Sequence, residues 1–261
     1  MRTTFSNDKF AILDDVLSSD QLAGFWRHLN ETEYNPVNRT VFKGQWKEAD
    51  GTPVESKLSI VASNLPIQNM LPPALAQAAA QIATFYPTRS PLDAVIDATR
   101  QCAQQFPDLV GKEQADWLGL TARLYKYPVN TSLSWHMDER LYTGAFIYYG
   151  HPVWDLKWGG ELLIADAFDR KALAKPTDPA AAEDGRPRDE VLMSEGLGHY
   201  VSPKPNRMVL LAPEVPHMIT KVHPDAGERF RASIAGFFVS PFGLQRIAEQ
   251  LASIPRSGAT A

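Results

Sequence analysis

TARLYKYPVNTSLSWHMD, residues 121–138, is the most informative stretch of this 261-residue chain. Residues 121–127 and 133–137 alternate in the manner of half-buried strands, with successive side chains on opposite faces. Pro128 and Asn130 lie between them and are turn residues. The stretch therefore predicts two short strands joined by a tight connection.

The pattern of short strands continues almost to the end of the chain. Five more strands are expected, at residues 143–149, 161–165, 208–212, 217–222 and 231–239. Short strands punctuated by Pro, Gly and Asn are typical of a sandwich or jelly roll and not of a parallel α/β sheet. The predicted fold class is mainly β with supporting helices.

The N-terminal part is expected to be mostly helical. Candidate N-cap residues within 14–22 precede Phe25, Trp26 and Leu29, whose spacing gives an apolar helical stripe. Three more helices are predicted, at residues 73–85, 91–106 and 242–251. A hairpin or irregular β segment is predicted at residues 39–62.

The length favours a single domain over residues 1–261. Residues 1–118 are expected to give mostly helical support, and residues 119–240 the jelly-roll core. Residues 166–199 form a long insertion whose middle cannot build a core, and such insertions are commonly lids or binding loops. A mobile loop near the site entrance and a tolerated surface insertion are both consistent with it.

The composition excludes some classes of partner. The net charge of −4 and the pI near 5.9 give no electrostatic footprint for nucleic acid. No apolar run reaches the roughly 20 residues of a membrane-spanning helix, and the N-terminus lacks a secretory segment. Cys102 is the only cysteine, which fits a reducing compartment. A cytoplasmic location is therefore expected.

A metal site is predicted at His136 and Asp138. Residues i and i+2 of a strand share a face, so an imidazole and a carboxylate stand side by side there. A second histidine would complete the two-histidine, one-carboxylate triad of non-haem Fe(II) oxygenases. His217 is favoured because it follows a buried strand and a tight connection, and His223 is the fallback. The remaining histidines are less suitable: His28, His151 and His199.

With these residues in place, the chain resembles the prolyl-4-hydroxylase-like branch of the Fe(II)/2-oxoglutarate-dependent oxygenases. The resemblance covers roughly residues 119–240 and rests on five segments in the family's order. They are residues 122–128, the His-x-Asp triplet, residues 146–149 followed by 158–162 with Gly-Gly-Glu-Leu, residues 203–210 and residues 231–238. It implies a double-stranded β-helix, which is a cupin-like jelly roll. It also implies that Fe(II), 2-oxoglutarate and O₂ are used.

The resemblance assigns roles to individual residues. His136, Asp138 and His217 match the iron ligands. Arg231 matches the residue that anchors the distal carboxylate of 2-oxoglutarate, for which a guanidinium is well suited; Arg229 competes with it. Ser233, Tyr149 and Tyr127 match positions near the cosubstrate, and either tyrosine can equally be a core aromatic.

The same resemblance implies a dioxygenase that oxidises an unactivated C–H bond. Halogenating relatives replace the ligand carboxylate with a small residue, so Asp138 favours hydroxylation, desaturation or cyclisation. The expected substrate is a small molecule, such as an amino-acid-derived compound or a natural-product intermediate. The alternatives are a peptidyl side chain, a nucleic-acid demethylase, a zinc-type hydrolase and a non-enzymatic jelly roll. Four residues flank the predicted mouth as candidate substrate contacts: Arg123, Arg140, Tyr142 and Trp154. The sequence predicts no oligomeric state.

Overall fold

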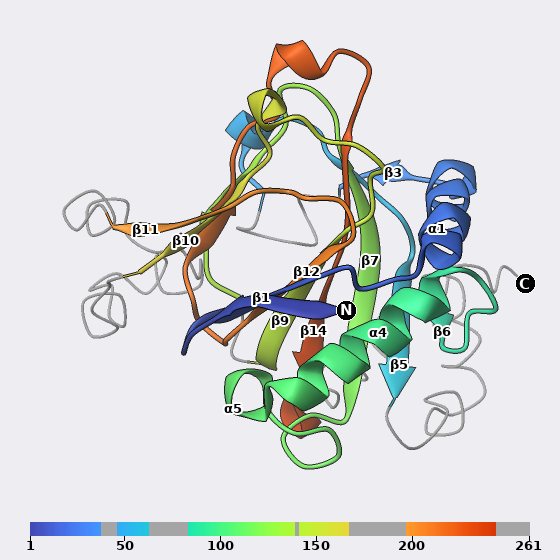
Figure 1. The fold of residues 1–261 in the computed structure, drawn as a ribbon, viewed down its shortest axis with the longest axis vertical. Coiled ribbons are helices and arrows are strands. Elements are labelled where there is room, and N and C mark those ends of the chain that lie inside the picture. Colours follow the sequence, from blue (N-terminus) through green and yellow to red (C-terminus); the bar gives the residue numbers. More distant parts are fainter. Residues whose placement is uncertain (38–45, 63–82, 139–140, 167–196, 244–261) are drawn as a thin grey trace, which may run out of the picture.

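Two antiparallel sheets form the centre of the computed structural model, which describes residues 1–37, 46–62, 83–138, 141–166 and 197–243 (Figure 1). The large sheet contains, in spatial order, β1 (Arg2–Ser6), β2 (Phe10–Asp14), β12 (Arg207–Leu211), β9 (Tyr142–Tyr149), β14 (Arg231–Val239), β7 (Gly119–Tyr127), β4 (Val54–Glu55) and β3 (Asn35–Pro36). Two further strands extend it beside β7: β5 (Leu58–Ala62) and β6 (Ala83–Phe85). The small sheet is β11 (Gly198–Val201), β10 (Leu162–Ala165), β13 (His217–Ile219) and β8 (Leu133–His136).

The winding of the chain identifies the architecture. From β7 onward the chain passes to β8 in the small sheet, returns to β9 in the large sheet, and then enters β10 and β11 in the small sheet. It returns to β12, crosses to β13 and ends in β14 at the centre of the large sheet. This alternation between two facing antiparallel sheets is a jelly roll, and it confirms the predicted fold class.

The alternation of side chains along each strand divides the core into two regions. On β14, Ala232, Ile234 and Phe238 pack towards the helices, in a cluster with Phe25 and other buried residues. The alternate positions face the space between the two sheets, where Tyr127 and Tyr149 of the large sheet meet apolar residues of the small sheet. A one-residue shift of β14 would exchange these two sets, so burial on both faces fixes its register.

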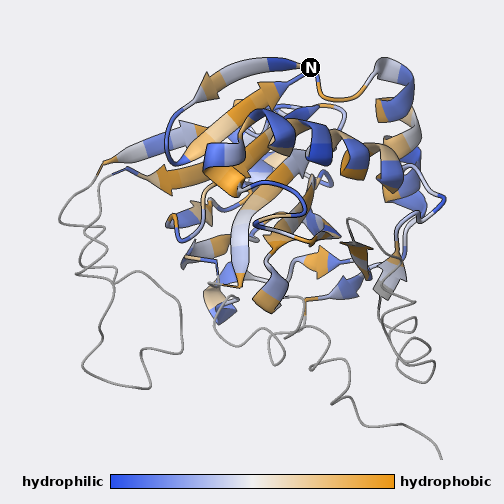
Figure 2. Ribbon diagram, turned by 90° about the horizontal axis from the view of Figure 1, so that it is seen from below, coloured by the Kyte–Doolittle hydropathy of each residue, from blue (hydrophilic) through white to orange (hydrophobic). Residues whose placement is uncertain are grey.

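The helices cover the outer face of the large sheet. These are α1 (Ser19–Glu31), α4 (Leu92–Gln105) and α5 (Pro107–Val110). Helix α1 begins at the N-cap Ser18, which forms a capping box with Gln21, and it buries Phe25 and Leu29. Both long helices carry apolar and polar residues, as Figure 2 shows. The helices predicted through residues 25–29 and over residues 91–106 are thus confirmed.

The N-terminal part differs from the expectation in two places. Strands β1 and β2 were not predicted. All five residues of β2 are buried, and so short a buried run shows no alternation by which a strand could be distinguished from a helix. The helix predicted over residues 73–85 is wrong at its end, because Ala83–Phe85 pairs in parallel with β5. The rest of that segment, most of the insertion at 166–199 and residues 244–251 lie outside the described residues. Among the described residues, no helix is long and apolar enough to cross a membrane.

A buried ionic cluster fastens the N-terminal strands to the jelly roll. Asp14, 2% exposed at the end of β2, accepts hydrogen bonds from Arg207 Nε at 2.7 Å and Nη2 at 3.1 Å. Lys204 Nζ and Thr4 Oγ1 donate to the same carboxylate. Burial alone would raise the pKa of Asp14, but the bonds from Arg207 and Lys204 dominate and hold it well below the ordinary value.

The substitution Asp14→Ala is expected to destabilise the protein by about 3–5 kcal/mol, because it leaves the buried guanidinium of Arg207 without its partner. The loss is measured by urea unfolding at pH 7. Because the folded-state pKa of Asp14 is depressed, its stabilisation is present above about pH 4 and declines as the pH falls, so the difference from wild type narrows in acid.

Asp8→Ala is the matched control, because Asp8 is exposed and its change is expected to cost less than about 0.5 kcal/mol. A loss for Asp14→Ala no larger than that of this control would contradict the structural role of the cluster.

Candidate metal centre

The pairing of β8 with β13 brings two histidines together. His136 is the last residue of β8, His217 is the first of β13, and the two are direct partners across the strands. Their ring centroids lie 4.2 Å apart. The sequence predicted both residues, and the structure places them side by side on the inner face of the small sheet.

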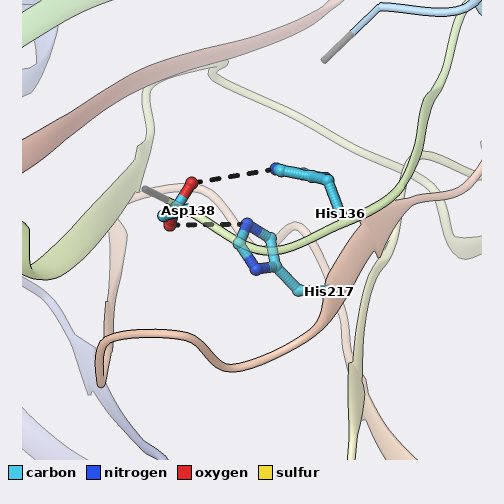
Figure 3. Close-up of side chains that lie close together, drawn as sticks. All are labelled: His136, Asp138 and His217. Atoms are coloured by element: carbon cyan, nitrogen blue, oxygen red, sulfur yellow. Dashed lines mark ion pairs between the residues drawn. The ribbon is translucent and has the colours of Figure 1, made fainter. Parts of the chain in front are cut away.

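Asp138 completes the cluster from the segment that follows β8. Its Oδ1 lies 3.9 Å from His136 Nε2, and its Oδ2 lies 4.0 Å from His217 Nε2 (Figure 3). One ligand atom from each residue lies within 4.8 Å of the others, and the two histidines are each 5% exposed. Among the described residues, this is the group of histidine, cysteine and acidic side chains that is close enough to hold a metal ion.

Backbone carbonyls fix which nitrogen of each imidazole faces the cluster. His136 Nδ1 lies 2.9 Å from the carbonyl oxygen of Ser134, and His217 Nδ1 lies 2.9 Å from that of Val215. A carbonyl oxygen only accepts, so each Nδ1 must carry the hydrogen. Each Nε2 then presents its lone pair towards Asp138, as a metal ligand requires.

The electrostatic environment suits a cation. Burial lowers the pKa of His136 to about 3, with a contribution from neighbouring His217, so its imidazole is neutral at pH 7. Burial raises the pKa of Asp138, opposed by His217. The buried carboxylate of Asp138 lies beside two imidazole rings, and a divalent metal held between them would balance its charge. The donor set fits Fe(II) in the facial arrangement.

Asp50 supports this site, and no local sequence pattern indicated this role. The residue is 1% exposed, and its Oδ1 accepts hydrogen bonds from the hydroxyls of Ser132 at 3.0 Å and Ser134 at 2.7 Å. Its carbonyl oxygen also accepts from the backbone N–H of Ser132. The carboxylate thereby holds the start of β8, whose Ser134 carbonyl orients His136.

Arg231 lies on the inner face of the large sheet. It is 0% exposed, and its guanidinium lies over the rings of Tyr127 and Tyr149, at 4.9 and 4.8 Å from their centroids. Its Nε donates to the carbonyl oxygen of Gly160 at 2.8 Å, and its Nη1 donates to Ser233 Oγ at 3.1 Å. Gly160 has φ +74°, and a Cβ there would lie 2.8 Å from Arg231 Cδ, so only glycine fits comfortably. The structure thus brings together the four residues predicted for cosubstrate binding.

Two polar atoms in this group have no hydrogen-bond partner among the described residues. They are Arg231 Nη2 and Tyr149 Oη, and both are buried. Burial raises the pKa of Tyr149, against the opposing charge of Arg231, so the phenol keeps its proton and can donate. Buried donors left unpaired are costly and indicate an absent ligand. A carboxylate accepts from both and neutralises the guanidinium, which is the fit expected for the distal end of 2-oxoglutarate.

The candidate substrate residues lie in different surroundings. Arg123 pairs with Glu55, and Tyr142 stacks on Phe237 with centroids 4.1 Å apart. Trp154 Nε1 donates to the carbonyl oxygen of Gly159 at 2.8 Å, next to the turn that holds Arg231. Trp154 is therefore placed at the Arg231 end of the site. Arg140 lies outside the described residues.

The other histidines lie elsewhere. The side chain of His223, the fallback ligand, is 58% exposed and faces Asp225. His151 is bonded to the backbone of Ala232 and Pro203. His199 pairs with Asp166, and His28 lies in the last turn of α1.

Structural comparison finds solved structures of similar fold, including the following three. A prolyl hydroxylase from Trichoplax adhaerens, solved with a hypoxia inducible factor oxygen degradation domain peptide fragment, superposes with a TM-score of 0.54 at 12% identity, covering 95% of this chain and 88% of that one. A Pseudomonas putida prolyl-4-hydroxylase gives a TM-score of 0.48 at 18% identity, covering 89% of this chain and 94% of that one. A 2OG-Fe(II) oxygenase family oxidoreductase from Burkholderia pseudomallei gives a TM-score of 0.48 at 13% identity, covering 88% of this chain and 85% of that one.

No family model matches the chain, and no curated protein matches its sequence. The superposition on the Trichoplax adhaerens enzyme confirms the jelly-roll fold.

Replacing His217 with alanine is expected to weaken Fe(II) binding at least about 100-fold, because one of three ligands is removed. Substitution of residues that only hydrogen-bond to the ligands already weakens metal binding about 10–100-fold. His223→Ala is the control and is expected to leave binding unchanged. Anaerobic titration with Fe(II), monitored calorimetrically, measures both. Equal effects of the two substitutions would contradict the triad.

Proposed function

We propose that the protein is an Fe(II)- and 2-oxoglutarate-dependent dioxygenase that hydroxylates an unactivated C–H bond. The observation that carries this proposal is a pair of buried donors, Arg231 Nη2 and Tyr149 Oη, that have no hydrogen-bond partner in the described part of the chain. They lie on the inner face of a jelly roll that also holds the His-Asp-His cluster. A metal-dependent hydrolase needs the cluster but not the buried guanidinium. A non-enzymatic jelly roll needs neither.

Each group of residues has a distinct task in this proposal. His136, Asp138 and His217 would hold Fe(II). Arg231 and Tyr149 receive the distal carboxylate of 2-oxoglutarate, and Ser233 holds the guanidinium in place through Nη1. When bound, Fe(II) and 2-oxoglutarate supply the chemistry that activates O₂.

The surroundings keep water away from these groups. The guanidinium of Arg231 lies over the rings of Tyr127 and Tyr149, and both tyrosines are at most 2% exposed. A charge-assisted hydrogen bond to a carboxylate is stronger in such an environment than in water. The site is therefore preorganised to bind a dianionic cosubstrate.

The substrate of the proposed reaction is a small molecule, such as an amino-acid-derived compound or a natural-product intermediate. A peptidyl side chain is the second candidate, because the Trichoplax adhaerens enzyme of similar fold was solved with a peptide fragment. A nucleic-acid substrate is disfavoured by the net charge of −4.

Two wider proposals accompany this function. Residues 1–261 form one domain, which is supported by the pairing of β2 with β12 across the length of the chain. The protein is cytoplasmic, which is supported by its having a single cysteine.

Anaerobic titration with Fe(II) and 2-oxoglutarate tests the proposed function. A weak visible charge-transfer band is expected for the wild type, and His136→Ala should not form it because a ligand is lost. Arg231→Ala should need about 100-fold more 2-oxoglutarate, because charge-assisted hydrogen bonds to the distal carboxylate are removed.

Arg229→Ala is the matched control, since Arg229 precedes Arg231 by two residues and its guanidinium lies over the Trp158 ring instead. Absence of the band in the wild type, or equal 2-oxoglutarate affinity of the two arginine variants, would overturn the proposal.

A further inference from the structure

An ion pair lies on the inner face of the large sheet, on the same strand face as the cosubstrate tyrosines. Arg123 Nη1 on β7 is 2.6 Å from Glu55 Oε2 on β4, and the side chains are only 14% and 11% exposed. Burial of such a pair is seldom the most stable choice, since apolar residues of similar volume often do as well or better. Its presence inside a jelly roll therefore calls for a role in binding.

The strand register places this pair relative to the rest of the site. Arg123 and Tyr127 lie on β7 four residues apart, so both face inward. Tyr127 is opposite Arg231 on β14, whereas Arg123 is opposite Ala235. Glu55 is the direct partner of Tyr125 across β4 and β7. The ion pair thus stands further along the barrel than the Arg231 group.

Tyr125 connects the ion pair to the metal cluster. Burial raises its pKa to about 12; the charge of Arg123 opposes this, and the charges of Glu55 and Asp138 add to it. The hydroxyl therefore stays protonated within the electrostatic field of both the ion pair and a metal ligand. Trp46 packs near Tyr125 and Tyr127, with centroids 6.1 and 6.0 Å away. Tyr125 thus lies next to the ion pair, and its hydroxyl is also subject to the charge of Asp138, a residue of the metal cluster.

The charges of the ion pair indicate what could bind it. Arg123 and Glu55 carry opposite charges, so the pair has no net charge. A ligand with one negative and one positive group can replace both halves of the pair, whereas a ligand with a single charge would leave Arg123 or Glu55 uncompensated, which is strongly unfavourable.

We propose that Arg123 and Glu55 form a subsite for a zwitterionic head group, so that the substrate is a free amino acid or a close derivative. The carboxylate of the substrate binds the guanidinium of Arg123, which has five N–H donors, and its ammonium binds the carboxylate of Glu55. An internal peptide residue has neither charge. This inference rests on the proposed function and names its class of substrate.

The first test compares free and capped amino acids. Anaerobic wild-type protein loaded with Fe(II) and 2-oxoglutarate is titrated with the common L-amino acids and with the N-acetyl amide of each, and binding is read as a change in the visible band. At least one free amino acid should bind, about 100-fold more tightly than its capped form, because two charge-assisted contacts are lost on capping.

Equal binding of free and capped forms, or no binding by any free amino acid, would overturn the zwitterion subsite. Absence of the band before any amino acid is added would instead overturn the proposed function, so the two failures are distinguishable.

The second test uses variants of the pair. The double substitution Glu55→Gln with Arg123→Gln leaves no unpaired buried charge, so the fold is expected to survive. It should raise the Kd of the responding amino acid about 100-fold and change the Kd of 2-oxoglutarate less than about twofold. Thermal unfolding checks that the variant is folded.

Arg100→Gln is the matched control, because Arg100 pairs with Glu113 at the same 2.6 Å but lies on α4, outside the barrel. It should leave both Kd values at their wild-type levels. An amino-acid Kd unchanged in the double variant would also overturn the subsite.

Discussion

The antiparallel pairing of β8 with β13 is the constraint on which the site depends. It sets His136 directly opposite His217, and the chain then needs only two more residues to bring Asp138 alongside. Because side chains alternate along a strand, a slip of one residue would turn one histidine out of the cluster. Neighbouring pairs fix the register: His217 is also opposite Ile164 of β10, which is fully buried.

The interior of the jelly roll is more polar than a core of this size needs to be. Arg231, Arg123, Glu55 and the metal cluster all lie on its inner faces, where isolated charges are unfavourable. Arg231 contacts two tyrosine rings, one carbonyl and one hydroxyl, and its Nη2 still has no hydrogen-bond partner among the described residues. We interpret this as a local loss of folding stability at a binding site, which is offset by burial in the apolar cluster under the helices.

Much of this arrangement could be predicted from the sequence. Residues 231–239 were predicted as a strand and are one, because nine residues of clear alternation leave no ambiguity. The inward face of β14 then followed, and with it the neighbourhood of Arg231 and Ser233. The metal cluster could be predicted because His136 and Asp138 are two positions apart, and because few histidines compete for the third place.

Other parts were not accessible, for physical reasons. Strand β2 is wholly buried and has no period to distinguish it from a helix, and Ala83–Phe85 takes its conformation from its partner β5. Asp50 and Glu55 act through contacts with residues about 70 to 80 positions away, which no local pattern records. Tyr125 could have been predicted as a residue of the site, because it lies between Arg123 and Tyr127 on the same face of one strand.

We conclude that the inner faces of the jelly roll bind a metal at the His-Asp-His cluster and a carboxylate at Arg231. A crystal structure of the protein grown anaerobically with Mn(II) and 2-oxoglutarate tests this conclusion most directly. We expect the metal on His136, Asp138 and His217, with the distal carboxylate accepting hydrogen bonds from Arg231 Nη2 and Tyr149 Oη. A metal bound elsewhere, or 2-oxoglutarate on the metal with its distal carboxylate away from Arg231, would contradict it.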